Sequence, residues 1–299
     1  MLPPPGRPYR IGAGARSDDP ATFSALSRFA RGTMIDHIQV LLIPGPEASV
    51  NRQIAALEDA CVPVMIHAPH HGQGVNPSDP EMTGRSGPAG RAWMDAAMAE
   101  TFEAADRTAA PVIVLHPGAF RSGEKEAAEI RIADFLDDYR DKRLILENLP
   151  AVYDECSFLG TDAAELSRIG RGRIRGYCLD FAHLYCAAQT RNRSFYHELA
   201  AFGALSIRFC HLSNVRRGSG RDEHLALDHP AGGLDFAAVM AFLRRRPRIH
   251  TSLEYKENDP AVYRRQLAVF DALYWQHRSP EPENLPRYPR RCRRPLRMA

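Results

Sequence analysis

Short apolar runs alternate with amphipathic stretches along most of this chain of 299 residues. Eight runs, mostly rich in valine, isoleucine and leucine and with little polar alternation, are typical of strands buried on both faces. Between them apolar residues recur at helical spacing, as from Phe236 to Leu243. Eight such alternations favour a (β/α)8 TIM barrel over an open sheet. The predicted strands are Tyr9–Gly12, His37–Leu42, Pro63–His67, Val112–His116, Leu144–Glu147, Gly176–Asp180, Ile207–His211 and Thr251–Glu254.

Histidines and carboxylates lie where six of these runs end, and two more follow in the loop after the seventh run. Polar groups of this kind are costly beside buried strands unless they are paired or bind a metal. In a barrel the carboxyl ends of all strands surround one mouth, so we expect these side chains to meet in one site. The nine residues are His67, His116, Glu147, Asp180, His183, His211, Asp222, His224 and Glu254.

Five imidazoles and four carboxylates suit zinc, manganese or iron without any thiolate ligand. Because one zinc ion takes about four ligands, nine ligands indicate two to three ions with at least one shared carboxylate. Clustered divalent ions can generate hydroxide near neutral pH and stabilise the leaving oxygen of a phosphodiester. They could equally stabilise the enediolate of a sugar isomerisation, so the residue types alone leave both reactions open.

Composition sets further bounds. With 44% hydrophobic residues, the chain can bury one large core. It has no apolar span long enough to cross a membrane, and its start, MLPPPGRPYR, lacks the apolar centre of a signal peptide. Six cysteines without a CxxC pair fit free thiols in a reducing compartment. We therefore expect a cytoplasmic protein, not associated with a membrane, that acts as a monomer.

The charge is unevenly distributed. The segment 279–299 holds six arginines against two glutamates, whereas the whole chain carries a net charge of +3, which leaves the rest at −1. We expect residues 1–278 to form a single catalytic barrel domain and 279–299 to be a flexible Pro- and Arg-rich tail. Such a tail could add salt-sensitive affinity for phosphates.

Seven short motifs occur in the order seen in a known family, and from about residue 10 to 256 the chain resembles endonuclease IV, AP endonuclease family 2. The resemblance implies a xylose-isomerase-like TIM barrel that cleaves the phosphodiester 5′ to abasic sites in DNA with three zinc ions and metal-bound hydroxide. The motifs are His-Ala-Pro at 67–69, His-Pro-Gly at 116–118, Glu-Asn at 147–148, Leu-Asp-x-x-His at 179–183, His-Leu-Ser-Asn at 211–214, Gly-Ser-x-Arg-Asp-x-His at 218–224 and Leu-Glu at 253–254.

The same resemblance implies a role for each ligand. His67, His116 and Glu147 would hold the first ion, and Glu147 would bridge to a second. Glu147 and Glu254 are the candidate catalytic carboxylates. The second ion would be completed by Asp180, His211 and Glu254, and the third held by His183, Asp222 and His224. Zinc is the expected metal, with Mn2+ or Fe2+ as alternatives.

The chain departs from the family's pattern where DNA would be contacted. His70 stands where the family usually has tyrosine, the first strand ends in Gly-Ala-Gly at 12–14 instead of Gly-Ala-His, and LALDHPAGGLDF replaces a glycine-rich turn after His224. His70 and three arginines of the nearby loop remain candidate nucleic-acid contacts, whereas His71 is expected to be structural. The three arginines are Arg216, Arg217 and Arg221.

Three functions therefore remain open. The first is a multinuclear phosphodiesterase acting on abasic DNA. The second is a sugar isomerase or epimerase of the same superfamily, which would take a small sugar and use a single metal. The third is a non-catalytic, metal-stabilised nucleic-acid binder. We favour the first, because four predicted ligands would have no clear task in a one-metal isomerase: His67, His116, Asp222 and His224.

Overall fold

The computed structural model describes residues 7–276, except for residues 86, 154–155 and 257–258. The predicted tail at 279–299 and the predicted domain boundary at 278 lie outside the described residues. Both therefore remain expectations.

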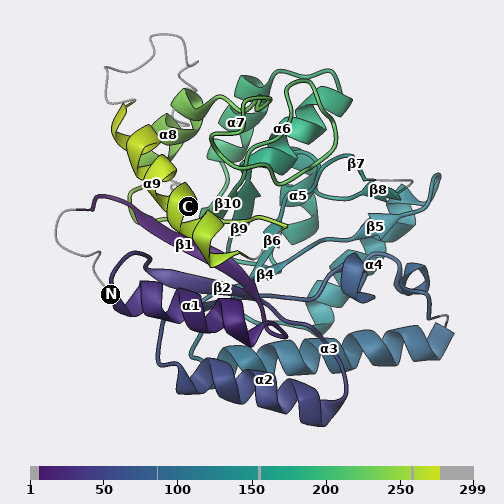
Figure 1. Ribbon diagram of the computed structural model, residues 1–299. Coiled ribbons are helices and arrows are strands. Elements are labelled where there is room, and N and C mark those ends of the chain that lie inside the picture. The colour runs from purple at the N-terminus through teal and green to yellow at the C-terminus, as the bar shows by residue number, and fades with distance from the viewer. Residues whose placement is uncertain (1–6, 86, 154–155, 257–258, 277–299) are drawn as a thin grey trace, which may run out of the picture.

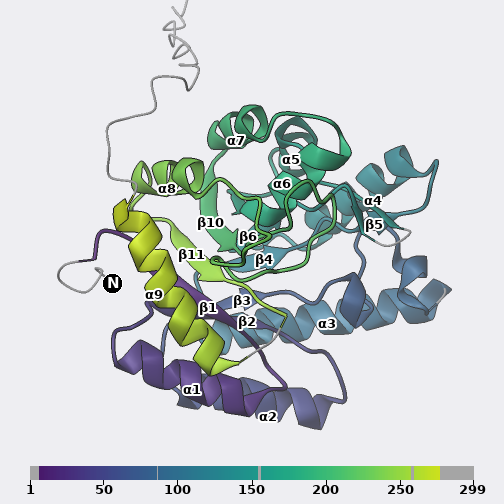
Figure 2. The ribbon, with the colours of Figure 1, turned by 45° about the horizontal axis from the view of Figure 1, so that its top comes forward.

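Parallel strands close into the predicted barrel, in the order β1-β11-β10-β9-β6-β4-β3-β2 within the part of the chain that is described (Figures 1 and 2). All eight predicted runs contribute a strand. The main difference is at β1, which continues to Arg16, four residues beyond the predicted end. The strands are β1 (Arg10–Arg16), β2 (His37–Leu41), β3 (Val64–His67), β4 (Ile113–Leu115), β6 (Leu144–Glu147), β9 (Tyr177–Asp180), β10 (Ile207–Leu212) and β11 (His250–Leu253).

Helices surround the barrel, with α1, α2 and α3 along one side and α5 to α8 on the opposite side (Figures 1 and 2). Asp19, Asp162 and Asp235 each accept a hydrogen bond from a backbone N–H of the helix that follows. The helices are α1 (Pro20–Arg31), α2 (Glu47–Asp59), α3 (Gly87–Arg107), α4 (Lys125–Asp138), α5 (Ala163–Gly170), α6 (Phe181–Thr190), α7 (Phe195–Gly203), α8 (Phe236–Arg244) and α9 (Pro260–Gln276). No described helix is long and apolar enough to cross a membrane.

The interior of the barrel contains a layer of five buried side chains from neighbouring strands. Their chain neighbours, such as Ile113 and Leu115 on β4, belong instead to the larger core between the strands and the helices. Side chains alternate between the two faces of a strand, so these five point into the barrel. They are Met65, Val114, Ile145, Cys178 and Phe209.

A small antiparallel sheet lies beside the barrel mouth and was not predicted. It consists of β5 (Ala119–Phe120), β7 (Val152–Tyr153) and β8 (Cys156–Phe158), in the order β5-β8-β7. Two short 3-10 helices, η1 (His71–Gln73) and η2 (Pro80–Thr83), follow β3. Together these insertions form one wall around the mouth, since Phe158 and His71 both line the cavity there.

Gly12 shows how tightly the lower barrel is packed. A Cβ atom at this position would lie 2.3 Å from Nε2 of His37. The His37 ring is fully buried and cannot easily move, because its nitrogens lie 2.9 Å from the Ser252 hydroxyl and 3.0 Å from Nδ1 of His250.

We therefore expect Gly12→Ala to lower the free energy of unfolding by about 1–3 kcal/mol through overpacking. Gly45→Ala is the matched control, because a Cβ there meets nothing within 4 Å. Urea denaturation of the two variants measures the difference. Equal stability of both would show that the His37 ring has room to move.

Candidate metal centre

The five apolar side chains inside the barrel, from Met65 to Phe209, form the floor of the site. The layer above this floor is polar, and the two-residue period of the strands explains why. Moving two positions along each strand from a floor residue reaches the next side chain that points into the barrel. On β6 this step leads from Ile145 to Glu147, and on β9 from Cys178 to Asp180. On β3, β4 and β10 the same step reaches three of the predicted histidines: His67, His116 and His211.

Glu147 lies at the centre of this layer, with its residue fully buried. Its Oε2 atom is 3.3 Å from Nε2 of His67 and 3.2 Å from Nε2 of His116. Its Oε1 atom is 2.8 Å from Nδ1 of His211 and 3.3 Å from Nδ1 of His183. One carboxylate therefore contacts imidazoles from four different parts of the barrel.

A second group surrounds His211. Its Nε2 atom lies 3.2 Å from Oε1 of Glu254 and 2.7 Å from Nε2 of Gln39, and its Nδ1 atom lies 4.0 Å from Oδ2 of Asp180. Glu254 is the more exposed carboxylate, since its side chain is 20% accessible and lines the cavity. The same imidazole thus connects the buried Glu147 to the cavity.

A third group lies at the start of α6 and in the loop after β10. Oδ2 of Asp222 is 2.6 Å from Nε2 of His224 and 3.5 Å from Nε2 of His183. Asp180 accepts a hydrogen bond from the backbone N–H of His183, which places His183 in the first helical turn. The backbone of His224 has φ of 50°, a left-handed conformation that costs energy for a non-glycine residue. Strain of this kind is typical of residues held for a function.

The structure therefore brings all nine predicted ligands together, in three adjoining groups around Glu147. Within the described chain, sets of three donor atoms lie within 4.8 Å of one another, including His67–His116–Glu147 and His183–Asp222–His224. Their role as ligands stays a prediction, because proximity alone does not show that an ion binds.

Several buried oxygen and nitrogen atoms that could bind a metal form no hydrogen bond with any described residue. They include Oε2 of Glu147, Oδ2 of Asp180, and Nδ1 of both His116 and His224. Buried polar atoms normally have a hydrogen-bond partner, so several unpaired ones in one place need an explanation. Carboxylate oxygens and imidazole nitrogens are donors that divalent ions such as zinc accept, and the set present fits such ions.

Electrostatics divides the histidines into two kinds. Burial lowers the pKa of His116 to about 3, despite the nearby Glu147. Burial also acts against protonation of His211, but the carboxylates of Glu147 and Glu254 outweigh it and raise the pKa of His211 to about 9. For His183, the neighbouring Asp180 and Asp222 likewise overcome burial and raise the pKa well above its usual value.

The pKa values of two buried carboxylates shift in opposite directions. Burial would raise the pKa of Glu147, yet His211 and His116 lower it well below the usual range. Burial raises the pKa of Asp180 to about 6, with a further contribution from the negative charge of Glu147. The carboxylates of the centre thus favour the protonated forms of His183 and His211, which have raised pKa values.

A cavity of about 420 Å3 opens above this layer. Its wall contains His67, His116, His183, Asp222, His224 and Glu254, and at the rim stand Arg16 and Lys256. Leu149, Pro150 and Phe158, beside the small sheet, form part of the apolar wall. This volume is in the range of a small-molecule site.

The four candidate nucleic-acid contacts lie in different surroundings. His70 is half-buried and lines the cavity. The three arginines are exposed and are not part of the cavity wall, and Arg216 forms an ion pair with Glu223, their closest atoms 3.3 Å apart. Contact of Arg216, Arg217 and Arg221 with a nucleic acid remains a prediction.

Sequence reasoning missed two residues of the site. His71, which was expected to be structural, lines the cavity and contacts Phe158 edge to face at 5.0 Å between ring centroids. Gln39 touches His211, as described above. A signal for Gln39 existed, because it is the polar residue between the apolar Ile38 and Val40 of one predicted strand. No comparable signal marks His71, whose place depends on the turn that η1 forms.

A closed (β/α)8 barrel whose mouth is lined by histidines and carboxylates defines the class of this fold, the TIM barrels. The chain belongs to the xylose isomerase-like TIM barrel family, whose model matches residues 36–273. No curated protein sequence matches the chain significantly.

Solved structures share the fold at low sequence identity. Endonuclease IV from Thermus thermophilus has a TM-score of 0.63 at 21% identity, with 89% of this chain and 99% of that chain covered. A D-tagatose 3-epimerase-like protein has a TM-score of 0.64 at 18% identity, covering 89% and 98%. Another Thermus thermophilus protein, soaked with ZnCl2, has a TM-score of 0.62 at 19% identity, covering 90% and 99%. At these identities the likeness shows the fold and leaves the reaction open.

The protonated histidines generate a prediction about metal binding. With a pKa of about 9, His211 carries a proton at pH 7 in protein stripped of metal, and an ion that binds its nitrogen must displace that proton. Zinc binding at pH 7 should therefore release protons, and zinc affinity should rise with pH until about 9. Calorimetric titration in two buffers of different ionisation enthalpy measures the release. Heats that do not depend on the buffer would contradict it.

Proposed function

We propose that this protein is a multinuclear metal-dependent phosphodiesterase of the endonuclease IV type, which hydrolyses the bond 5′ to abasic sites in DNA. The observation that carries the proposal is the convergence of the surplus donors. His183, Asp222 and His224 form a group of their own, and it adjoins Glu147 through the 3.3 Å contact of His183. A single-metal enzyme has no use for this group.

In this proposal the chain holds two to three zinc ions, with Mn2+ or Fe2+ as alternatives. Glu147 would belong to two of the ligand sets, as its central position among the imidazoles suggests. The ligand sets are His67–His116–Glu147, Glu147–Asp180–His211–Glu254 and His183–Asp222–His224. Bound divalent ions would supply positive charge that activates water and stabilises the developing negative charge on phosphate oxygens.

The chain's own residues would perform the remaining tasks. Glu254, the accessible carboxylate of the centre, would accept a proton from an attacking water. Arg16 and Lys256 at the rim would attract the phosphate backbone. The apolar side chains of Leu149, Pro150 and Phe158 would exclude water from their part of the cavity.

Abasic DNA is the proposed substrate because the cavity suits one extruded sugar-phosphate better than a base-paired duplex. A missing base lowers the cost of moving that nucleotide out of the helix. His70 lines the cavity and offers an aromatic surface to the distorted strand, where the resembling family usually has tyrosine. We expect the protein to act as a monomer.

A sugar isomerase or epimerase is the second candidate. The four residues that such an enzyme would need, Glu147, Asp180, His211 and Glu254, lie together around His211. The fold is also shared with a D-tagatose 3-epimerase-like protein. In that case one ion would be held, and Glu254 would act on a carbon-bound proton of the sugar.

The reaction can be tested directly. We expect strand cleavage of a duplex that contains one abasic site, no cleavage of the intact duplex, and loss of cleavage with a chelator that returns on addition of zinc. The same protein should leave a panel of ketoses and aldoses unchanged. Isomerisation of a free sugar without any strand cleavage would overturn the proposal in favour of the second candidate.

Two matched variants separate the candidates further. Asp222→Asn removes a carboxylate of the third group only, whereas Glu254→Gln removes one from the group that both candidates need. For the phosphodiesterase we expect both variants to lose at least about 100-fold in kcat, since ligand and proton-transfer groups contribute on this scale. Asp222→Asn should also reduce the zinc content measured by elemental analysis. Full activity of Asp222→Asn, with only Glu254→Gln impaired, would favour the single-metal enzyme.

A further inference from the structure

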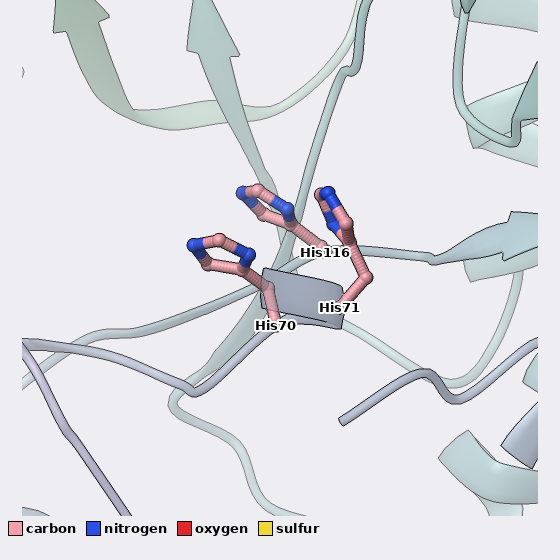
Figure 3. Close-up of side chains that lie close together, drawn as sticks. All are labelled: His70, His71 and His116. Carbon is pink, nitrogen blue, oxygen red and sulfur yellow. The ribbon is translucent and has the colours of Figure 1, made fainter. Parts of the chain in front are cut away.

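His70 is an aromatic side chain that lies in stacking geometry on a predicted ligand. Its ring covers that of His116, with centroids 4.7 Å apart and planes inclined by 18°. Figure 3 shows the two rings one over the other and His71 at their side. The two residues come from different segments, the turn after β3 and the end of β4.

His116 differs from His67 and His183 in how its ring is held. Ligating histidines usually donate their second N–H to an acceptor, which fixes the orientation of the ring. His67 has such a contact, with Nδ1 2.8 Å from the carbonyl oxygen of Ala68, and so does His183, with Nδ1 2.9 Å from that of Asn148. Nδ1 of His116 is buried and forms no hydrogen bond within the described part of the chain.

Nitrogens of His70, His71 and His116 also come within 4.8 Å of one another, which raises the question of a metal site made by these three. The ring geometry argues against it. The lone pair of an imidazole nitrogen lies in the ring plane, so two nearly parallel, stacked rings direct their lone pairs side by side and not at one ion. Moreover, Nδ1 of His70 already accepts the N–H of Gly72.

The turn holds His70 firmly in place. The ring accepts the Gly72 N–H at 3.2 Å, and the backbone N–H of His70 donates to Oε1 of Gln73 at 3.2 Å, a capping box around η1. The sequence His-His-Gly-Gln thus fixes the ring that covers His116. A fixed ring on one face restricts rotation of the other ring by close packing.

We propose that His70 is a positioning residue for His116. By stacking on its imidazole, His70 replaces the missing hydrogen bond and keeps Nε2 of His116 beside Oε2 of Glu147, 3.2 Å away. The inference rests on the proposed function, in that His116 is taken to bind an ion. It assigns His70 a task in metal binding besides any contact with the substrate.

Two variants of His70 separate stacking from the other roles of the side chain. His70→Phe keeps an aromatic ring but loses both nitrogens. His70→Asn keeps an acceptor that can cap η1 but loses the ring. The control is His71→Asn, because the ring of His71 lies 6.5 Å from that of His116 between centroids. Zinc affinity is measured by competition with a chromophoric chelator, and site geometry by the visible spectrum of the Co2+-loaded protein.

We expect His70→Asn to weaken the tightest-bound zinc by about 10-fold or more and to alter the Co2+ spectrum, as loss of an orienting partner does. His71→Asn should stay within about 3-fold of the original chain, with an unchanged spectrum, since it leaves the stack intact. His70→Phe should retain more zinc affinity than His70→Asn, because it keeps the ring although it loses the Gly72 hydrogen bond that holds it. Circular dichroism melts show whether each variant is folded, and a variant that does not fold is replaced by His70→Tyr or His70→Gln.

The outcomes distinguish this inference from the function on which it rests. If the original chain binds zinc and His70→Asn binds it equally well, the positioning role is wrong. If His70→Phe and His71→Asn each lose one equivalent of metal, the three histidines are ligands and the stack is not the reason for their arrangement. If the original chain itself binds no zinc, the proposed function fails first.

Discussion

A fully buried carboxylate among four imidazoles is the constraint on which the rest of this structure depends. Removing the charge of Glu147 from water costs several kcal/mol, and only well-placed partners offset that cost. The partners come from β3, β4, α6 and β10, which are separated by up to about half the chain. They can surround Glu147 only if the barrel closes with its strands in register. The polar centre and the apolar fold therefore specify each other.

Much of the fold could be predicted because side chains alternate between the two faces of a strand with a period of two residues. Strands buried on both faces appear as short apolar runs, and a histidine or carboxylate two residues beyond an inward-facing apolar residue must point into the barrel mouth. The meeting of side chains such as His67 and Glu147 follows from that rule together with barrel closure. Their role as ligands was suggested by residue type and family resemblance, and it awaits measurement.

Other parts could not be predicted, for physical reasons. The strands β5, β7 and β8 are two or three residues long, too short to show a period. The stack of His70 on His116 depends on a 3-10 turn whose hydrogen bonds join residues close to each other in the chain, and apolar patterning does not register such turns. The contact of Gln39 with His211 joins residues 172 positions apart and follows only from three-dimensional closure.

The chain shares its fold with both an endonuclease and an epimerase-like protein at low sequence identity. This fits a barrel whose apolar interior can stay the same while the loops around its mouth differ. The apolar layer from Met65 to Phe209 supports any chemistry at the mouth, because it lies below the polar centre and contains no charged group. The cavity above this layer is lined by the loop that carries Asp222 and by the insertions that carry His71 and Phe158, and in our proposal these decide the reaction. Similarity of fold therefore reflects the apolar interior of the barrel, whereas the choice of substrate depends on the loops.

The two carboxylate oxygens of Asp180 have separate tasks. Oδ1 caps α6 through the N–H of His183, while Oδ2 is buried without a hydrogen bond among the described residues. Asparagine could keep the cap but would remove the charge, and glutamate could keep the charge but would displace the cap. Substitution of Asp180 is therefore restricted both by the helix cap and by the buried charge. The start of α6 is in this way joined to the polar centre through a single side chain.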